Sequence, residues 1–389
     1  MVNKRSYVYF PGLNSIRFIL ALVIIVYHIE EIKIFAGIKN LFKISTMRTT
    51  AEISATFFFV LTGFLITYLL LRENKEFGNV SIKRFYARRV LRTWPLYFFL
   101  VILSLFILPR ISLMEIPGFT NAIYDKFLTK ATLYFLILPQ VVSILFVPNP
   151  YCSHSWTIGI EEQIYLIWPL VLKNKRKYIN IFVFFIIFFT GVIFVLNFIL
   201  HKFKPIFVPD VYIKYLEFLH RYLEWFRIRP VAIGGLGGYL LFSDNKKVLG
   251  FIFKRNVQVV VFIILFLLLS NGVTMGYITY EFYSVLFCIL LLNISVNKDS
   301  VIKLENKLLN YFGKVSYGLY MYHPIAIYIS LSALKHLSIN KDSMIVTNLF
   351  IYTVSLFLTV IFSLLSYFLF ERWFLKFKVN FSRIVSAAK

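Results

Sequence analysis

The sequence predicts an all-α fold, a polytopic transmembrane helix bundle with about ten spanning helices, and its composition is the first reason. Of the 389 residues, 59% are hydrophobic and 15% are charged, whereas soluble domains are roughly half apolar and a quarter charged. The 44 Phe and 25 Tyr residues suit lipid-facing surfaces and the membrane–water interface. The mean hydropathy of +0.76 agrees with this class.

Apolar segments long enough to span a bilayer recur along the whole chain. A spanning helix needs about 20 mainly apolar residues. The sixth segment is shorter, and its four glycines suit either close helix packing or a break that lines a cavity. The segments lie at residues 13–32, 53–71, 91–108, 155–172, 178–200, 231–243, 256–272, 277–296, 316–334 and 343–370.

The distribution of Lys and Arg predicts that both termini face the cytoplasm, because cytoplasmic loops are enriched in positive charge. The loops on that side, together with both tails, carry 26 Lys and Arg, and the opposite loops carry 15. A spanning helix at 128–147 would move the basic cluster at 173–177 outside, so we expect 128–147 to be an interfacial or re-entrant piece on the outer side. The cytoplasmic loops are 72–92, 173–177, 244–255 and 297–314, and the outer loops are 33–48, 110–130, 201–230 and 335–341.

The remaining global features indicate a single membrane domain over residues 1–389, with no appended soluble domain. The net charge of +24 does not indicate nucleic-acid binding, because basic loops next to anionic lipids account for it and no nucleic-acid-binding motif accompanies it. Cys152 and Cys288 are too few for a disulfide framework and are not expected to pair. The first apolar segment lacks a small-residue cleavage site, so we expect it to remain as a membrane anchor.

Arg17 and His28 are the first candidate site residues, because both interrupt an apolar helix. Eleven residues at about 100° each bring them to one helical face, about 16.5 Å apart along the axis. Charged and titratable side chains inside a membrane usually face a protein interior or a water-filled path, and His is suited to proton removal near neutral pH. The alternative is an Arg that snorkels at the helix end and an interfacial His.

A basic cluster at the start of the third predicted helix is the second candidate. Arg92 follows Arg88 and Arg89 by four and three residues, so it shares a helical face with them. Their guanidinium groups offer forked donors for phosphate. The alternative is the ordinary enrichment of positive charge on the cytoplasmic side.

A third group, His154 with Ser155, leads into Glu161 and Glu162 within a predicted helix. Adjacent helical residues point about 100° apart, so at most one of the two carboxylates should face a site directly. A Glu can orient and stabilise a His that acts as a base. The alternative is an interfacial carboxylate pair in a salt bridge.

Tyr320 and His323 form a fourth group, three residues apart on the ninth predicted helix and followed by Pro324. A proline kink beside a His often borders a cavity, although a simply packed kink is the alternative. The sequence contains no His-Glu-x-x-His zinc spacing, no P-loop, no dinucleotide fingerprint and no Gly-x-Ser-x-Gly nucleophile elbow. We therefore expect no metal and no nucleotide cofactor of those classes.

In their order along the chain, these groups resemble the membrane-bound acyltransferase family 3, whose members O-acylate bacterial surface glycans, lipid-linked sugars and some secondary metabolites. The resemblance covers about residues 8 to 374, and one departure is Asn14-Ser15, where many members have Asp-Gly. The motifs that carry it are FPGLNSIRF (10–18) with Tyr-His at 27–28, FFFVLTGFLI (57–66), RVLR (89–92), SWT (155–157) with EEQIY (161–165), GKVSYGLYMYHP (313–324) and Glu-Arg at 371–372.

The resemblance implies transfer of an acyl group from cytoplasmic acyl-CoA to a hydroxyl of a sugar or glycan at the outer side of the membrane. The acyl group that we expect is acetyl. It implies that His28 is the catalytic base or a transient acyl carrier, and that Arg17 binds the donor or stabilises developing oxyanion charge. Glu161 would orient partners in the site. The residues expected to bind coenzyme A are Arg88, Arg89 and Arg92, and the supporting residues are Ser155, Glu162, Tyr320 and His323.

Two other classes of protein fit parts of the sequence. A secondary transporter or a lipid-linked sugar flippase would share the polar residues within spans and the Gly-rich short helix, but no inverted repeat relates the two halves. A structural or sensor protein gives no reason for Arg17, His28, Glu161 and His323 to lie in or beside spans. We therefore expect an acyltransferase of the bacterial cytoplasmic membrane whose partners are acyl-CoA, a glycan acceptor and lipid.

Overall fold

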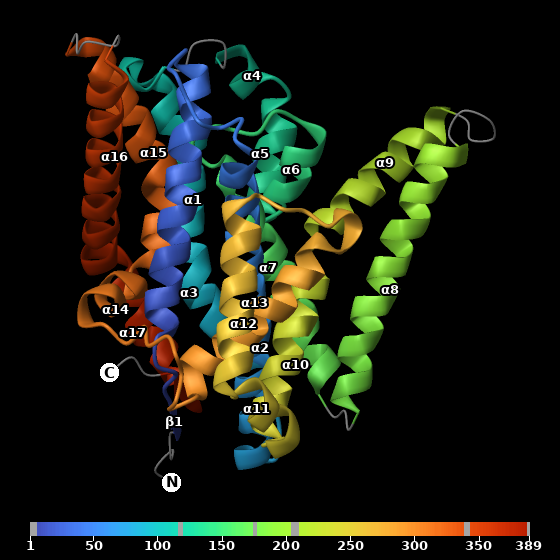
Figure 1. Cartoon of the computed structure of the whole chain (residues 1–389). Helices are drawn as coiled ribbons and strands as arrows, with labels where there is room; N and C mark the ends of the chain where they lie inside the picture. The colour runs from blue at the N-terminus through green and yellow to red at the C-terminus, as the bar shows by residue number, and fades with distance from the viewer. Residues whose placement is uncertain (1–5, 116–119, 174–176, 204–209, 338–342, 387–389) are drawn as a thin grey trace.

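The computed structural model describes residues 6–115, 120–173, 177–203, 210–337 and 343–386, which fold into a helical bundle (Figure 1). The all-α fold class is confirmed, because the described ranges contain two strands of three residues each and are otherwise helices and connections. The helices are α1 (Leu13–Phe35), α2 (Ser45–Phe77), α3 (Ile82–Ile102), α4 (Thr120–Tyr124), α5 (Phe127–Phe135), α6 (Pro139–Leu145), α7 (Trp156–Leu172), α8 (Tyr178–Phe198), α9 (Asp210–Trp225), α10 (Ile228–Phe242), α11 (Lys246–Ile252), α12 (Arg255–Ser270), α13 (Thr279–Val296), α14 (Lys307–Lys314), α15 (Ser316–His336), α16 (Met344–Ser366) and α17 (Arg372–Asn380).

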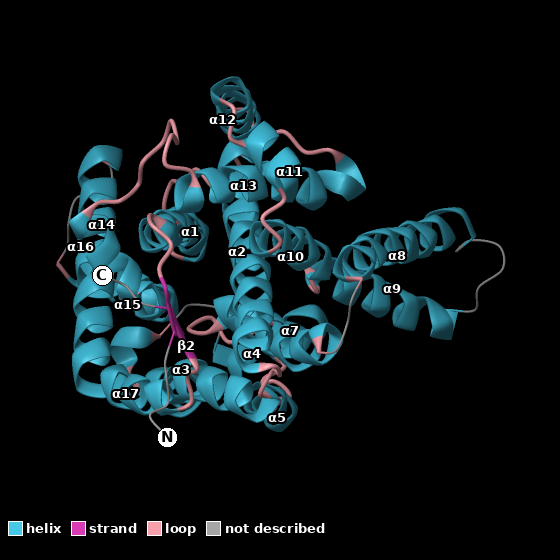
Figure 2. Ribbon diagram, turned by 90° about the horizontal axis from the view of Figure 1, so that it is seen from below, coloured by secondary structure: helices cyan, strands magenta, loops and turns pink. Residues whose placement is uncertain are grey.

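The two ends of the described chain lie together at one end of the bundle (Figures 1 and 2). Strand β1 (Ser6–Val8) pairs in parallel with β2 (Ile384–Ser386), with Ser6 opposite Ile384. This pairing agrees with the expectation that both termini lie on the same side of a membrane. That this side is the cytoplasm stays a prediction from the charge distribution.

All ten predicted spanning segments are helical in the structure. Fewer than ten helices of the described chain, however, are both long enough and apolar enough to span a membrane. Within the described residues, five helical segments are long and apolar enough to cross a membrane, and six if α11 and α12, bent by 58° relative to each other, form one span. α7 and α10 have 17 and 15 residues, shorter than the about 20 residues of a straight span. The number of ten spanning helices therefore stays a prediction. The five segments are Ser45–Phe77, Ile82–Arg110, Tyr178–Lys202, Gly276–Val296 and Met344–Asn380.

The apolar run at 128–147 forms two short helices, α5 and α6, and no continuous span. Ile137, between them, has a positive φ of 58°, and Pro139 at the start of α6 disfavours helical geometry in the residue before it. α4 and α5 lie toward the end of the bundle opposite the termini (Figure 1). This broken geometry agrees with an interfacial or re-entrant piece at the end away from the termini.

The predicted outer loop 201–230 contains a helix that hydropathy did not detect. α9 covers Asp210–Trp225, and with α8 it stands to one side of the bundle in both views (Figures 1 and 2). Charged and apolar residues alternate along α9 with helical spacing, so its average hydropathy is too low for a span although its pattern is helical. Parts of the predicted loops 110–130, 173–177, 201–230 and 335–341 lie outside the described residues.

The glycines of α10 allow direct backbone contact with α2. A Cβ added at Gly63 would lie 2.0 Å from the carbonyl oxygen of Val231, and one at Gly234 would lie 2.0 Å from that of Val60. Both distances are far below van der Waals contact, so side chains larger than hydrogen do not fit at this crossing. Of the two interpretations of the Gly-rich segment, close helix packing is the one that the structure supports.

Replacing Gly234 with Ala should therefore destabilise the protein by about 1–3 kcal/mol or more, because the new methyl group overlaps backbone atoms of α2 that cannot rotate away. Thermal unfolding in detergent would measure the effect. Gly191 on α8 is the matched control, because a Cβ there meets nothing within 4 Å. Equal unfolding temperatures for Gly234→Ala and Gly191→Ala would contradict the close crossing.

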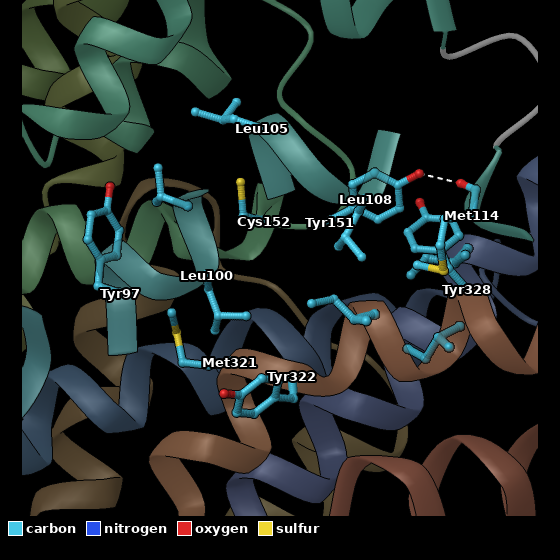
Figure 3. Close-up of a cluster of buried hydrophobic side chains, with 14 of the residues drawn as sticks. Tyr97, Leu100, Leu105, Leu108, Met114, Tyr151, Cys152, Met321, Tyr322 and Tyr328 are labelled. Carbon is cyan, nitrogen blue, oxygen red and sulfur yellow. Dashed lines mark hydrogen bonds between the residues drawn. The ribbon is translucent and has the colours of Figure 1, made fainter. Parts of the chain in front are cut away.

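A buried cluster holds the backbone next to His154 and His323 in place (Figure 3). The hydroxyl group of Tyr97 in this cluster donates to the carbonyl of Tyr134 at 2.8 Å, which ties α3 to α5. Cys152 and Cys288 are both buried and free, so the expectation that they do not pair is confirmed. The cluster includes Tyr97, Leu100, Leu105, Leu108, Met114, Tyr151, Cys152, Met321, Tyr322 and Tyr328.

Candidate active site

A cavity of about 290 Å³ lies between α1, α2, α3, α7, α15 and the C-terminal segment. Ligand pockets in proteins have volumes of roughly 300–1,000 Å³, so this one is at the small end of the range. One wall is apolar and comes largely from α2, including Phe58, Leu61 and Leu65. One end is lined by Ile384 and Val385 of β2, where the chain ends meet.

The charged side chains in the described lining are strongly unbalanced. Five are cationic and one, Glu161, is a carboxylate. The predicted cluster on α3 and the predicted Arg17 on α1 thus meet in one cavity, which the sequence could not place. The fifth cation was not predicted, because it comes from α17, far along the chain. The five cations are Arg17, Arg88, Arg89, Arg92 and Lys378.

The three arginines of α3 differ in how far protein groups already engage them. Arg88 lies 3.5 Å from a carboxylate oxygen of Glu73 and donates to the carbonyl of Phe381 at 2.9 Å. Arg89 lies over the ring of Tyr165, 4.5 Å from its centre. Arg89 and Arg92 form no ion pair with a carboxylate in the described residues, so both are free to bind an anion.

Arg17 lines the cavity from the second turn of α1. Its Nη1 donates to the side-chain oxygen of Asn14 at 3.3 Å. Asn14 stands where the sequence pattern led us to expect Asp, so here a neutral amide takes the place of a carboxylate beside Arg17. Among the described residues, the guanidinium of Arg17 therefore forms no ion pair with a carboxylate.

The two adjacent carboxylates of α7 point in different directions, as their angular separation predicts. Glu161 lines the cavity and accepts hydrogen bonds from Thr62 at 3.2 Å and from Tyr165 at 3.1 Å. Glu162 accepts from Thr93 at 2.6 Å and from the indole of Trp94 at 3.0 Å. Glu162 thus fastens α7 to α3 and does not line the cavity.

Tyr320 and Thr157 line the cavity at a hydrogen-bonded contact between α15 and α7. The Tyr320 hydroxyl donates to the carbonyl of His154 at 2.6 Å and lies 2.8 Å from the hydroxyl of Thr157. Because the single proton of Tyr320 is used on the carbonyl, Thr157 donates the second bond. Ser155 is fully buried and donates to the carbonyl of Cys152 at 2.6 Å. It does not line the cavity.

Next to Tyr320, three histidines pack against one another. The rings of His28 and His323 lie 4.9 Å apart between centres, and those of His154 and His323 lie 4.8 Å apart. His323 and His154 are buried, with exposed fractions of 0% and 2%. Within the described ranges, no set of three His, Cys, Asp or Glu side chains is arranged to hold a metal ion.

Pro324 determines which nitrogen of His323 carries the proton. Proline has no N–H, so the carbonyl of Tyr320, four residues earlier, lacks its usual helical donor. The Nδ1 atom of His323 lies 2.6 Å from that carbonyl, and because a carbonyl only accepts, Nδ1 must donate. In neutral His323 the buried Nε2 atom is then a bare acceptor, and it has no partner among the described residues.

His28 has its own carboxylate partner, Glu31, on the same helix. The Nδ1 atom of His28 lies 2.7 Å from a carboxylate oxygen of Glu31, so Nδ1 carries the proton and Nε2 is free to accept one. We expected Glu161 to orient partners in the site, but the carboxylate that holds His28 is Glu31. The signal in the sequence was the three-residue spacing between His28 and Glu31, which places them on one helical face.

The fold and the site together describe an integral membrane protein with a cavity lined mostly by cations, beside a histidine–carboxylate pair. The chain belongs to the membrane-bound acyltransferase family 3: the family model, described as an acyltransferase domain, matches residues 10–368. The resemblance noted in the sequence is thereby confirmed across nearly the whole chain.

Several curated proteins are similar to this chain. A Staphylococcus aureus (strain COL) protein named "Putative O-acetyltransferase" is 26% identical over 385 residues, which cover 92% of this chain and 56% of that protein. A Listeria monocytogenes peptidoglycan O-acetyltransferase is 29% identical over 182 residues, 46% of this chain and 26% of that protein. The chain thus spans about half the length of the first of these relatives. No solved structure matches it significantly.

Proposed function

We propose that this protein transfers an acetyl group from acetyl-CoA to a hydroxyl group of a sugar or glycan. In this proposal, residues 1–389 form one membrane-embedded acyltransferase domain in the bacterial cytoplasmic membrane. The donor enters from the side of the chain termini, and the acceptor reacts at the opposite, outer side. The observation that carries the proposal is the cavity with five cations and one carboxylate, next to the His28–Glu31 pair.

The chemistry of the donor matches the lining. Coenzyme A carries three phosphate groups, and guanidinium groups bind phosphate through paired charge-assisted hydrogen bonds. Arg17, Arg89 and Arg92 have no carboxylate partner within the described residues, so a bound anion would compensate their charge. The apolar wall from α2 suits the uncharged arm between the phosphates and the thioester.

The proposed reaction uses His28 as the general base. The acceptor hydroxyl attacks the carbonyl carbon of the thioester while Nε2 of His28 takes the hydroxyl proton. The new C–O bond forms, the C–S bond breaks, and the thiolate of coenzyme A leaves and takes the proton from the imidazolium. Glu31 stabilises that imidazolium through Nδ1. Arg17 stabilises the oxyanion charge or the donor phosphates.

The remaining predicted residues have supporting roles in this proposal. Glu161 positions Tyr165 and balances part of the positive charge of Arg89 and Arg92. Tyr320 positions the backbone of His154. Arg88 supports the site at the end of the cavity near the chain termini. His323, Ser155 and Glu162 stabilise the packing of the helices around the site.

The names of the relatives support acetyl as the acyl group and a glycan as the acceptor. One relative is named a peptidoglycan O-acetyltransferase, and its similarity covers somewhat less than half of this chain. Glycans present hydroxyl groups outside the cell, whereas acyl-CoA is made inside. A base within the helix bundle could be reached by the donor from the inner side and by the acceptor from the outer side of the membrane.

Oriented membrane vesicles test this function. With labelled acetyl-CoA outside, vesicles that expose the termini should bind the donor saturably and acetylate an added glycan on the lumenal side. Vesicles of the opposite orientation should do neither until they are permeabilised. A folded protein that neither binds acetyl-CoA nor consumes it in either orientation would refute the donor.

A further inference from the structure

Lys378 on α17 is a cation of the cavity lining that the motifs of the family did not point to. Its side chain is partly buried, and it makes no hydrogen bond or ion pair with any described residue. The other four cations of the described lining are Arg17, Arg88, Arg89 and Arg92. Such like charges repel strongly in a low-dielectric interior, so this arrangement favours an anionic ligand.

Lys378 lies at the end of the cavity where the two chain termini meet. Ser382, which follows it, and Ile384 and Val385 of β2 line the same cavity. Strand β2 is paired with β1 (Figure 2). Tyr320, which borders the histidines, also lines this cavity. The cavity therefore connects the terminal segment with the neighbourhood of the proposed base.

Lys378 and Arg88 both line the cavity near the C-terminal segment, and they differ in their partners. Arg88 lies 3.5 Å from a carboxylate oxygen of Glu73 and donates to the carbonyl of Phe381. Its charge is therefore partly compensated. Lys378, one helical turn before Ser382, has no such hydrogen-bond or ion-pair partner for its side chain among the described residues.

We propose that Lys378 binds the 3′-phosphate group of coenzyme A, an inference that rests on the proposed function. Coenzyme A is a linear molecule with the thioester at one end, the diphosphate in the middle and the 3′-phosphoadenosine at the other end. With the thioester next to Tyr320, the 3′-phosphate reaches the end near the chain termini. Arg17, Arg89 and Arg92 then serve the diphosphate.

Binding of coenzyme A and of 3′-dephospho-coenzyme A to the full-length protein in lipid would test this assignment. The wild type should bind coenzyme A about 10- to 100-fold more tightly than the dephospho form, as expected for one charge-assisted contact. Lys378→Met should lose this preference by weakening coenzyme A binding alone. Lys378→Arg should retain most of it, because the positive charge remains.

Lys376→Met is the matched control, since Lys376 is exposed on the same helix and should leave both affinities unchanged. Unchanged binding of the dephospho form by Lys378→Met shows that the variant is folded. If Lys378→Met weakens the binding of both ligands equally, or of neither, Lys378 does not bind the 3′-phosphate. The proposal that acetyl-CoA is the donor would still stand. If the wild type binds neither ligand, the proposed function fails together with the inference.

Discussion

His28→Ala should lower kcat for acetyl transfer by about 10²–10⁴-fold, the range that a lost general base costs. Binding of acetyl-CoA should hardly change, because His28 does not line the cationic cavity. The measurement is single-turnover acetyl transfer in lipid vesicles, with donor binding measured in parallel. A variant that still transfers acetyl at the wild-type rate would exclude His28 as the base.

Glu31→Gln examines the partner that the structure assigns to His28. Glutamine keeps an oxygen that accepts from Nδ1 but removes the charge that stabilises the imidazolium, so kcat should fall by up to about 10⁴-fold, the loss seen when the carboxylate beside a catalytic histidine becomes an amide. Donor affinity should remain close to that of the wild type. A rate loss for Glu161→Gln with no loss for Glu31→Gln would reverse the assignment of the orienting carboxylate.

Replacing Arg89 and Arg92 together with Ala should weaken acetyl-CoA binding by about 10²–10⁴-fold, because each charge-assisted contact to phosphate contributes about 1.5–3 kcal/mol. Neither guanidinium forms an ion pair with a carboxylate within the described residues, so the double variant breaks no salt bridge there. Equilibrium binding of labelled acetyl-CoA measures this effect. At saturating donor the rate of transfer should recover in large part.

Arg84→Ala is the control for this double variant. Arg84 lies on the same helix but does not line the cavity, so its removal tests the general effect of positive charge at this end of the bundle. If Arg84→Ala weakens donor binding as much as the double variant, the arginines act through the membrane or through overall charge. That result would refute a specific phosphate site at Arg89 and Arg92.

The fold class was predictable because hydropathy and charge act on short stretches of chain. An apolar run needs lipid or protein around it wherever it lies, and all ten predicted segments are helices. α9 escaped prediction because an amphipathic helix has a pattern without a high average hydropathy. That 128–147 is not a continuous span was expected from loop charge, whereas the positive φ of Ile137 that separates its two helices, just before Pro139, is visible only in the structure.

By itself, the sequence determined the residue types of the site: a histidine, arginines and glutamates are costly in an apolar helix and need a polar surrounding. It also placed Arg88, Arg89 and Arg92 on one helix, since their spacing is local. Pairings across the bundle depend on helix packing, which the spacing along one helix does not specify.

Only the tertiary structure decided which of these charges share a cavity. It brought Lys378 from the last helix beside Arg17 from the first, turned Glu162 away toward α3, and packed His323 against His28. The physical reason is that charge and hydrogen bonding act over a few ångströms, and residues distant in sequence reach that range only when the helices pack.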